Sequence, residues 1–544
     1  MSYAKLLRFL VGYATLLALA SAGLYAYVAV DRAPARPLAT VVSIWQGGVR
    51  TARAATSGNP QTLLIEQSRA PGAQRVLEEV LDEGPLLATS APLFGISFVS
   101  TRDGVKVSYR DKVAYATPDD LLKLGAYGAK ARLANMQLNA GLDRGPALKF
   151  LARELHLSRT EMLQEGTFRR VAMRRVAAKP PPDELSPARL RESVVAAGRY
   201  LTRTLREDGS YRYEIDALTG EETPDYNWPR HAGATWFLTQ AAHLSGEQPM
   251  REAARSAAFH LVWRATKRCG EHHCVGEGDE LNLGSSSLAL LAYVELVETE
   301  IAPELLPQVR ALSAFVRSLQ RSDGEFKHVF DLREGRAIDV QKPYFAGEAA
   351  LALARAHRVT GDAADLEAAK RALAKLVERP AAFVTARYFW GSEHWTCQAM
   401  AELWDRAPSE RALAFCMGWQ EANRKNMLDG KVAPEYDGAH ASSALVAPRF
   451  TGAASRMEAA VATLSVARRA GLSERSVREL EAGVRRTLAF LLRHQFLPGP
   501  THLMVDPATV HGGFSGGMTD FHVRIDFPQH AGAALLRYLR LLEQ

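Results

Sequence analysis

The feature of this chain that most restricts its fold is a sequence phrase that recurs six times in its C-terminal two thirds. In each copy a polar loop leads into a helix start made of small residues, which continues as a Leu- and Ala-rich helix. A more charged, amphipathic segment precedes each copy. The copies occupy residues 225–242, 279–296, 342–357, 391–404, 452–467 and 524–539. Repetition at a period of roughly 50–70 residues indicates an array of one supersecondary unit, here a helical hairpin.

The alternation of two helix types predicts how these hairpins pack. A helix that is apolar almost all round is buried on most sides, whereas an amphipathic helix buries a single stripe. The pattern therefore predicts a mainly α fold, an (α/α)6 toroid over residues 181–544 with an inner and an outer ring. The links from outer to inner helices are long and polar, so we expect function there, at the N-terminal ends of the inner helices. The helix dipoles at those ends favour anionic ligands.

The N-terminus carries an uncharged run, residues 9–30, that is long enough to span a ~30 Å hydrocarbon core. A cleavable signal peptide is the alternative, because Ala20-Ser21-Ala22 has the small-x-small form of a cleavage site, although the apolar run continues past it. We expect an uncleaved transmembrane helix within residues 1–30. This helix would anchor the protein in a bacterial inner membrane as a single pass, with the bulk of the chain in the periplasm.

The region between this anchor and the toroid divides into two parts. Residues 31–60 are rich in Pro, Gly, Ala and Arg and predict a linker. Residues 61–180 predict a small α+β domain. Within it, residues 74–83 have a helical pattern, and the Asp103-Gly104 pair between two β-rich runs predicts a hairpin turn.

The four cysteines give limited information about the compartment. Cys269 and Cys274 bracket a short loop, where a local disulfide would suit an oxidising compartment. Free thiols are one alternative. A metal site that uses the two intervening histidines is another, but the spacing matches no common zinc pattern. Cys397 and Cys416 lie in helical patterns and are predicted to be small core residues.

The charge pattern and the motifs exclude several classes of function. The net charge of +7 is mild for 544 residues, and the basic residues form no run, so no nucleic-acid partner is expected. No serine-hydrolase elbow, phosphate-binding loop or standard zinc motif occurs, and we expect neither a cofactor nor a metal.

The long loops instead gather carboxylates, aromatic rings and cations in a predicted funnel. Paired carboxylates supply the acid and base of glycosidic chemistry, and Tyr or His can remove a proton next to a uronate carboxylate that Arg neutralises. The predicted catalytic residues are Tyr226, His231, Glu348 and Asp526. The predicted substrate-binding residues are Asn227, Arg230, Tyr344, Trp395, Arg449, Arg524 and His530. Two structural alternatives remain open: Asn before a helix is usually an N-cap, and the matching contexts RHAG and QHAG also suit a shared packing role for His231 and His530.

The phrases YNWPRHAGATWFL and VRIDFPQHAGAALL resemble those of bacterial alpha/alpha-toroid proteins, near the glucuronyl C5-epimerase C-terminal domain and the six-hairpin glycosidase group. The resemblance covers roughly residues 186–544. It implies Tyr, Glu and Arg side chains in the funnel. The positions here that could play such parts are Tyr226, Arg230, Glu348, Arg524 and Asp526.

Together these observations predict a membrane-anchored, periplasmic, carbohydrate-active protein. It would act on an acidic polysaccharide or glycan by hydrolase, lyase or epimerase chemistry. The alternative is a non-catalytic binding or scaffold module of a cell-envelope complex for polymer assembly or export. An enzyme requires a carboxylate with a second carboxylate, a Tyr or a His within roughly 5–10 Å in the funnel. A binding module requires only cations and aromatic rings.

Overall fold

The computed structural model describes residues 37–87, 95, 98–133, 136–176, 185–342, 344–378, 394–431, 433–441, 446–497 and 501–544. The chain forms two compact units. Unit 1 consists of Met1–Pro180, Leu428–Asp437 and Ala441–Pro448. Unit 2 consists of Pro181–Met427, Gly438–His440 and Arg449–Gln544.

The predicted anchor at residues 9–30 lies outside the described residues. Within the part of the chain that the structure describes, no helix combines the length and the apolar character that a bilayer crossing requires.

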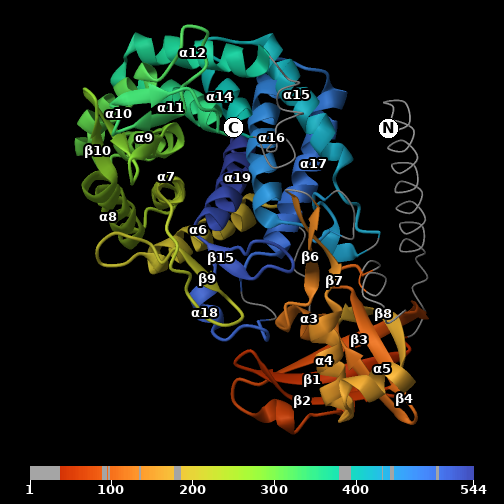
Figure 1. Cartoon of the computed structure of the whole chain (residues 1–544). Helices are drawn as coiled ribbons and strands as arrows, with labels where there is room; N and C mark the ends of the chain where they lie inside the picture. Colours follow the sequence, from red (N-terminus) through yellow and green to blue (C-terminus); the bar gives the residue numbers. More distant parts are fainter. Residues whose placement is uncertain are drawn as a thin grey trace, which may run out of the picture. The chain divides into compact units, whose positions relative to one another are not determined.

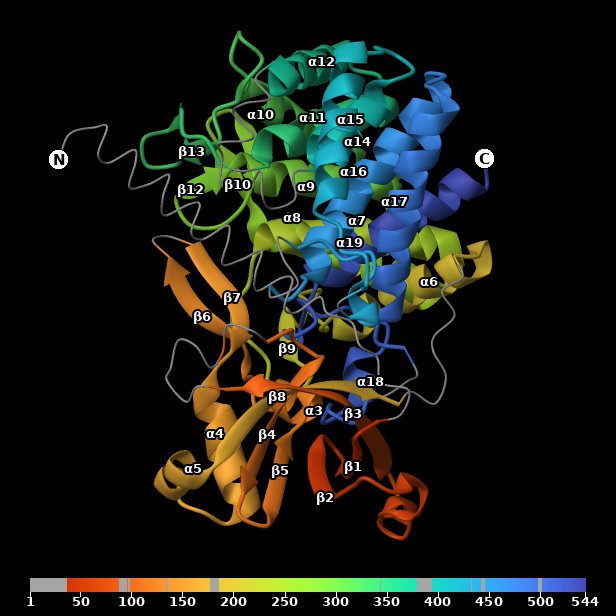
Figure 2. The ribbon, with the colours of Figure 1, turned by 90° about the vertical axis from the view of Figure 1, so that its right-hand side faces the viewer.

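Unit 1 is built on an antiparallel sheet with the strand order β2-β1-β3-β8-β4-β5 (Figure 2). These strands are β1 (Ala39–Gln46), β2 (Val49–Thr56), β3 (Gln74–Leu86), β4 (Asp103–Tyr109), β5 (Lys112–Ala116) and β8 (Thr167–Arg175). A separate hairpin pairs β6 (Tyr127–Leu133) with β7 (Met136–Leu142). Among the described residues of this unit, helices of six or more residues include α3 (Pro118–Lys123), α4 (Arg144–Leu155) and α5 (Arg159–Glu165), and α4 packs against β5.

Two segments of unit 1 differ from their predicted structure. The predicted linker at residues 31–60 contains β1 and β2. β1 is buried along almost its whole length and β2 is rich in Ala and Arg, so neither has the regular alternation of apolar and polar residues that identifies a strand. The segment at 74–83, predicted as a helix, lies in β3. Val76, Glu78 and Val80 are its buried, inward positions. Because the middle inward residue is a glutamate, the remaining apolar pair has the i, i+4 spacing of a helix.

The Asp103-Gly104 pair is not a turn, which corrects a third prediction. Both residues begin β4, and the hairpin turn falls at Arg110 and Asp111, between β4 and β5. A Cβ atom on Gly104 would lie 2.6 Å from the backbone oxygen of Ala116. Glycine therefore serves the close approach of two strands here rather than a reversal of the chain.

Unit 2 contains twelve long helices that alternate in type along the described chain (Figure 1). The outer, amphipathic set is α6 (Pro187–Thr204), α8 (Gln248–Ala265), α10 (Leu306–Ser318), α12 (Ala363–Glu378), α15 (Glu410–Lys425) and α17 (Glu474–Arg493). The inner set is α7 (Trp228–Ser245), α9 (Leu283–Glu298), α11 (Phe345–Thr360), α14 (Trp395–Leu403), α16 (Phe450–Arg469) and α19 (Asp526–Leu542). Each inner helix packs against the next, and α19 packs against α7, so the inner ring closes. Each outer helix packs across two neighbouring inner helices.

The small residues at the inner helix starts are needed where these helices converge. A Cβ atom on Gly284 of α9 would lie 2.4 Å from the ring of Phe345 on α11. A Cβ atom on Gly532 of α19 would lie 2.1 Å from the ring of Phe237 on α7. Contacts below 3.0 Å are too short for a carbon side chain, so these glycines allow the close packing of the inner ring.

Short strands join the long loops to one another. β9 (Glu214–Asp216), in the loop before α7, pairs with β15 (His522–Arg524), in the loop before α19. β12 (Glu280–Asn282), β13 (Val329–Asp331) and β14 (Arg336–Ile338) form a three-stranded sheet from the loops before α9 and α11. A short helix, α18 (Pro507–Val510), lies in the last loop.

Both pairs of cysteines form disulfides. Cys269–Cys274, the predicted pair, links β10 (Thr266–Cys269) to β11 (His272–Val275). Cys397 and Cys416 are buried, as expected of core residues, but they are also bonded to each other and tie inner helix α14 to outer helix α15.

Candidate functional site

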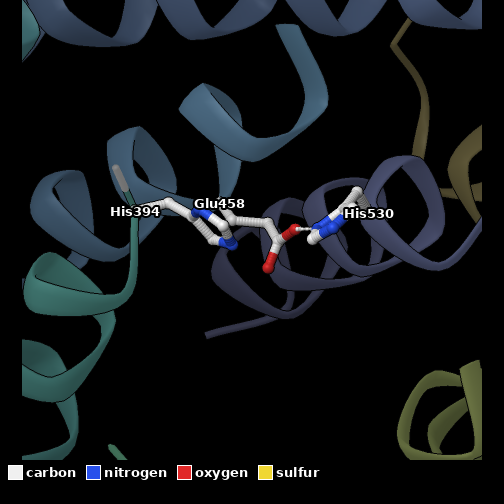
Figure 3. Close-up of side chains that lie close together, drawn as sticks. All are labelled: His394, Glu458 and His530. Carbon is white, nitrogen blue, oxygen red and sulfur yellow. Dashed lines mark hydrogen bonds and ion pairs between the residues drawn. The ribbon is translucent and has the colours of Figure 1, made fainter. Parts of the chain in front are cut away.

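Three side chains from neighbouring segments of the inner ring meet in one cluster (Figure 3). His394 directly precedes α14, Glu458 lies on α16 and His530 on α19. Nδ1 of His530 donates a hydrogen bond to Oε1 of Glu458 at 2.6 Å. One nitrogen or oxygen atom from each of the three side chains lies within 4.8 Å of the other two. The rings of His394 and His530 meet edge to face, with 5.2 Å between their centres.

Burial and charge make Glu458 and His530 an ion pair. Burial alone would raise the pKa of the fully enclosed Glu458 carboxyl, but the charge and the hydrogen bond of His530 lower it below its usual range. Burial alone would lower the pKa of His530, but Glu458 and the charge of Asp526 raise it. Both shifts favour the charged forms, an imidazolium and a carboxylate.

The second oxygen of Glu458 is held from the opposite side. Nε2 of Gln398 on α14 donates to Oε2 of Glu458 at 3.1 Å, and Gln398 accepts a hydrogen bond from Arg537 of α19. Arg537 lies over the ring of Trp236, whose Nε1 donates to the buried Glu295 at 2.9 Å. A series of polar contacts among the inner helices thus leads from the His394–Glu458–His530 cluster to Glu295.

Asp526, the first residue of α19, forms a second charged cluster. Arg524 donates to both of its oxygens, at 2.6 and 3.0 Å, and Nε of Arg230 donates to Oδ2 at 3.2 Å. The pairing of β15 with β9 places Arg524 beside the loop that carries Tyr213, whose hydroxyl accepts from Arg230 at 2.7 Å. Burial would raise the pKa of Asp526, but Arg524 and then Arg230 lower it, so this carboxylate stays ionised.

The predicted proton-transfer pair Tyr226 and His231 is joined, but inside the protein. His231 is fully buried, its Nε2 donates to the backbone oxygen of Ala257 at 2.9 Å, and its Nδ1 accepts from the hydroxyl of Tyr226 at 2.6 Å. Burial lowers the pKa of His231 to about 3 and raises that of Tyr226. Both nitrogens of His231 are therefore occupied and the ring stays neutral, which fits the packing alternative better than proton exchange with a substrate.

Two of the predicted binding residues have structural roles, and a third is exposed. Asn227 is the N-cap of α7, where its Oδ1 accepts from the backbone N–H of Arg230 at 3.2 Å. Trp395 is buried, with its ring 4.3 Å from that of His394 and 6.1 Å from that of Trp236, so it presents no open face to a sugar. Arg449 precedes α16 and is exposed.

Glu348 and Tyr344 belong to the start of α11. Glu348 is buried, and its Oε2 would lie 2.7 Å from a Cβ atom on Gly284, so the glycine makes room for the carboxylate. Tyr344 directly precedes the helix and has a φ of 72°. Backbone strain of this kind in a non-glycine residue often marks a functional position. Residues 379–393, which precede α14 in the sequence and include further aromatic residues and an acidic one, lie outside the described residues.

Sequence patterns alone did not single out the His394–Glu458–His530 cluster. His530 is among the predicted substrate-binding residues, whereas His394 and Glu458 are not among the predicted site residues. Glu458 and His530 are 72 residues apart, and no spacing rule links them. The usable signal was the cost of an unpaired buried carboxylate, which requires a cationic partner from another helix.

The same three residues have the chemistry of metal ligands, since two imidazoles and a carboxylate form many catalytic zinc sites. However, ligand atoms that bind zinc at about 2.0–2.2 Å stand more than 3 Å apart in tetrahedral geometry. The 2.6 Å contact between His530 and Glu458 is instead the length of a charge-assisted hydrogen bond. The geometry therefore suits a shared proton better than a metal ion.

No protein-family model matches this chain, and no curated protein matches its sequence. Among solved structures, a D-mannose isomerase is 13% identical with a TM-score of 0.50, and the match covers 67% of this chain and 100% of that one. Cellobiose 2-epimerase from Bacillus thermoamylovorans B4167 is 10% identical with a TM-score of 0.49, over 65% and 99% of the two chains. An unsaturated glucuronyl hydrolase specific for heparin is 11% identical with a TM-score of 0.46, over 66% and 99%.

Likeness at such low identity concerns the fold and not the reaction. Together with the closed inner ring, it establishes the architecture of unit 2. The helical unit of this chain has the six-hairpin alpha/alpha-toroid fold.

Proposed function

We propose that this protein is a carbohydrate-active enzyme that moves a proton at a carbon atom of a sugar, as an epimerase or an isomerase does. The observation that carries this proposal is the buried Glu458–His530 ion pair with His394 beside it. A carboxylate and two histidines within 4.8 Å support an enzyme rather than a binding module, because they can act as acid and base.

The reaction balances with an acid and a base alone. A base removes the proton from the carbon next to the carbonyl of an open-chain sugar, which gives an enediolate. For epimerisation, an acid returns a proton to the opposite face of the same carbon. For isomerisation, it returns a proton to the former carbonyl carbon, and the proton of the neighbouring hydroxyl group moves to the former carbonyl oxygen. Glu458 holds Nδ1 of His530 and raises its pKa, so His530 is suited to donate from Nε2. His394, whose ring meets that of His530 edge to face, would then be the group that accepts a proton (Figure 3).

Neither Glu458 nor Asp526 is suited to be the acid of a glycoside hydrolysis. Glycoside hydrolysis needs a carboxylic acid whose pKa is raised so that it can protonate the leaving group. The pKa values of Glu458 and Asp526 are both lowered by their cationic partners. Asp526 is therefore better suited to orient Arg524 and Arg230 than to act as an acid.

We propose a glycan substrate, and an acidic glycan in particular where Arg230 and Arg524 reach it. Both arginines are shared with Asp526, so a uronate would compete with that carboxylate for them. The fold that this unit shares with a D-mannose isomerase is compatible with neutral sugars as well. Both kinds of substrate therefore enter the test.

We also propose the compartment, a bacterial periplasm with the chain held to the inner membrane. Residues 9–30 contain no charge, and two disulfides suit an oxidising compartment. Fractionation of cells that express the full chain, with thiol labelling in the absence of reductant, tests both points. Labelling of all four cysteines in intact protein, or recovery in the cytosol, would contradict them.

The full chain, incubated with D-mannose, cellobiose and uronate-containing oligosaccharides and followed by NMR, tests the reaction. We expect a new configuration or a moved carbonyl at one sugar residue, with no change in chain length. The variant His530→Gln should abolish this product. The matched control His243→Gln, at an exposed position near the end of α7, should not. Shortened chains would indicate a hydrolase, new double bonds a lyase, and binding without any product a scaffold module of an envelope complex.

A further inference from the structure

A cavity of about 190 Å³ opens between outer helices α15 and α17 and inner helix α16. The three helices are neighbours in the ring (Figure 1). The apolar part of the wall consists of Met417, Met427, Met457, Ala460 and Leu480. Met457 and Ala460 lie on α16, but they face this cavity, whereas Glu458 of the same helix turns to His530. The cavity is therefore separate from the candidate active site.

Two amide groups line this cavity without satisfying their hydrogen-bonding capacity. Gln420 and Asn423 are more than nine-tenths buried on α15. Within the described parts of the chain, neither Nε2 of Gln420 nor Nδ2 of Asn423 has a hydrogen-bond partner. A buried donor normally has a partner, because an unpaired donor loses its hydrogen bonds to water without gaining others. Two such donors on one cavity wall indicate that the cavity is built to hold a molecule with acceptor atoms.

The histidine of the wall is neutral. His440 is buried, and its Nε2 lies 3.0 Å from the hydroxyl of Thr487. Burial lowers the pKa of His440 to about 3, and the charge of Arg456 lowers it further. The ring is uncharged at neutral pH and offers no ionic attraction to a ligand.

The charges at the mouth of the cavity are already paired. Arg424 and Glu421 form an ion pair at 2.8 Å, and Glu479 accepts from Arg475 at 2.9 Å. All these groups are exposed, so solvent and salt screen them further. Among the described residues that line the cavity, each of the charged side chains Glu421, Arg424 and Glu479 thus has an ion-pair partner.

We propose that this cavity binds a small neutral molecule that has an apolar body about the size of one aromatic ring and an acceptor oxygen at one end. An apolar cavity of about 150 Å³ accommodates benzene, so the volume here suits a ring with a short substituent. Methionine side chains adapt to such a body, and the amides of Gln420 and Asn423 donate to the oxygen.

Three probes of similar shape test the need for an acceptor oxygen separately from the need for a neutral ligand. Acetophenone has a carbonyl acceptor, isopropylbenzene replaces it with a methyl group, and benzoate carries a charge. Calorimetric titration of the full chain should show that acetophenone binds at least tenfold more tightly than either of the others. Equal binding of isopropylbenzene would overturn the role of the amides, and tighter binding of benzoate would overturn the preference for a neutral ligand. If no probe binds, the cavity holds only water and the proposal fails.

Variants locate the binding to the cavity. Asn423→Leu should remove the preference for acetophenone over isopropylbenzene, because it replaces a donor with an apolar group of similar size. Gly483→Leu on α17 should abolish binding of all probes, since this glycine lines the cavity and a Cβ atom there meets nothing within 4 Å. Gly418→Leu on α15 is the matched control: its Cβ atom is equally unobstructed, but Gly418 does not line the cavity. Unchanged binding in Gly483→Leu, with the fold intact by circular dichroism, would place the probes elsewhere.

Discussion

Replacing Glu458 by Gln removes one negative charge from the candidate active site and preserves the shape of the side chain. The carboxylate is fully enclosed, and the side chain of His530 is only 13% exposed. In the variant, the buried imidazole loses the partner that raises its pKa, so burial should bring that pKa below its ordinary value of 6.5. The ring would then be neutral at pH 7.

The structure sets the size of the effect on stability. Breaking a buried ion pair costs about 3–5 kcal/mol when the remaining charge is stranded. Here His530 can release its proton, and Gln can still accept from Nδ1, so we expect a loss of about 3 kcal/mol in the free energy of unfolding. The contribution of Glu458 is present above its ordinary pKa of 4.5 and is lost as the pH falls. The contribution of His530 is complete below its ordinary pKa of 6.5 and is lost as the pH rises through its raised value in the folded state.

Urea unfolding of the wild-type and Glu458→Gln proteins at a series of pH values measures this difference. It should be largest between about pH 4.5 and 6.5 and should shrink above the pKa of His530 in the folded protein. The control Glu474→Gln disrupts an exposed ion pair with Arg478 and should change stability by less than about 1 kcal/mol. A difference that stays constant from pH 4 to 9 would refute the ion pair, as would an NMR titration of His530 with a lowered pKa in the wild-type protein.

Four further outcomes follow from the structure. Asp526→Asn should cost about 3 kcal/mol in urea unfolding, because it leaves two arginines without their shared carboxylate, and an unchanged midpoint would contradict this. Gly284→Ala should lower the melting temperature, because the methyl group would overlap the contacts described above, whereas Gly418→Ala should leave it unchanged or raise it. The double variant Cys397→Ser, Cys416→Ser should lose about 3 kcal/mol by opening a loop of 19 residues, and reductant should have the same effect on the wild-type protein. Treatment with EDTA should leave turnover unchanged, and a loss that zinc restores would assign the cluster to a metal.

The helical unit could be predicted because its period is long and its packing requirements are repeated. Two helix types recur, and small residues recur where the inner helices begin. Gly532 shows the reason, because a side chain at this position of α19 would overlap the ring of Phe237 on α7. Unit 1 was harder to predict, because buried charges disguise its strands. Glu78 occupies an inward position of β3, so the alternation that identifies a strand was not visible in its apolar residues.

The site shows the same limit at the level of single residues. The arginines around Asp526 were predicted individually, but their arrangement depends on the pairing of β15 with β9, two short strands far apart in the sequence. His231 and His530 begin their helices in matching contexts, yet one faces a backbone oxygen and the other a carboxylate. Local sequence cannot distinguish them, because the partner in each case comes from a different helix.

Deuterium uptake from solvent tests most directly whether His530 and His394 exchange a proton with a sugar carbon. The full chain is incubated in D2O with each reducing sugar, and deuterium in the recovered sugar is located by NMR. We predict deuterium at the carbon next to the carbonyl with the wild-type protein and with His243→Gln, and none with His530→Gln or His394→Gln. Conversion of a sugar without deuterium at that carbon, or uptake that persists in both histidine variants, would contradict the proposed reaction.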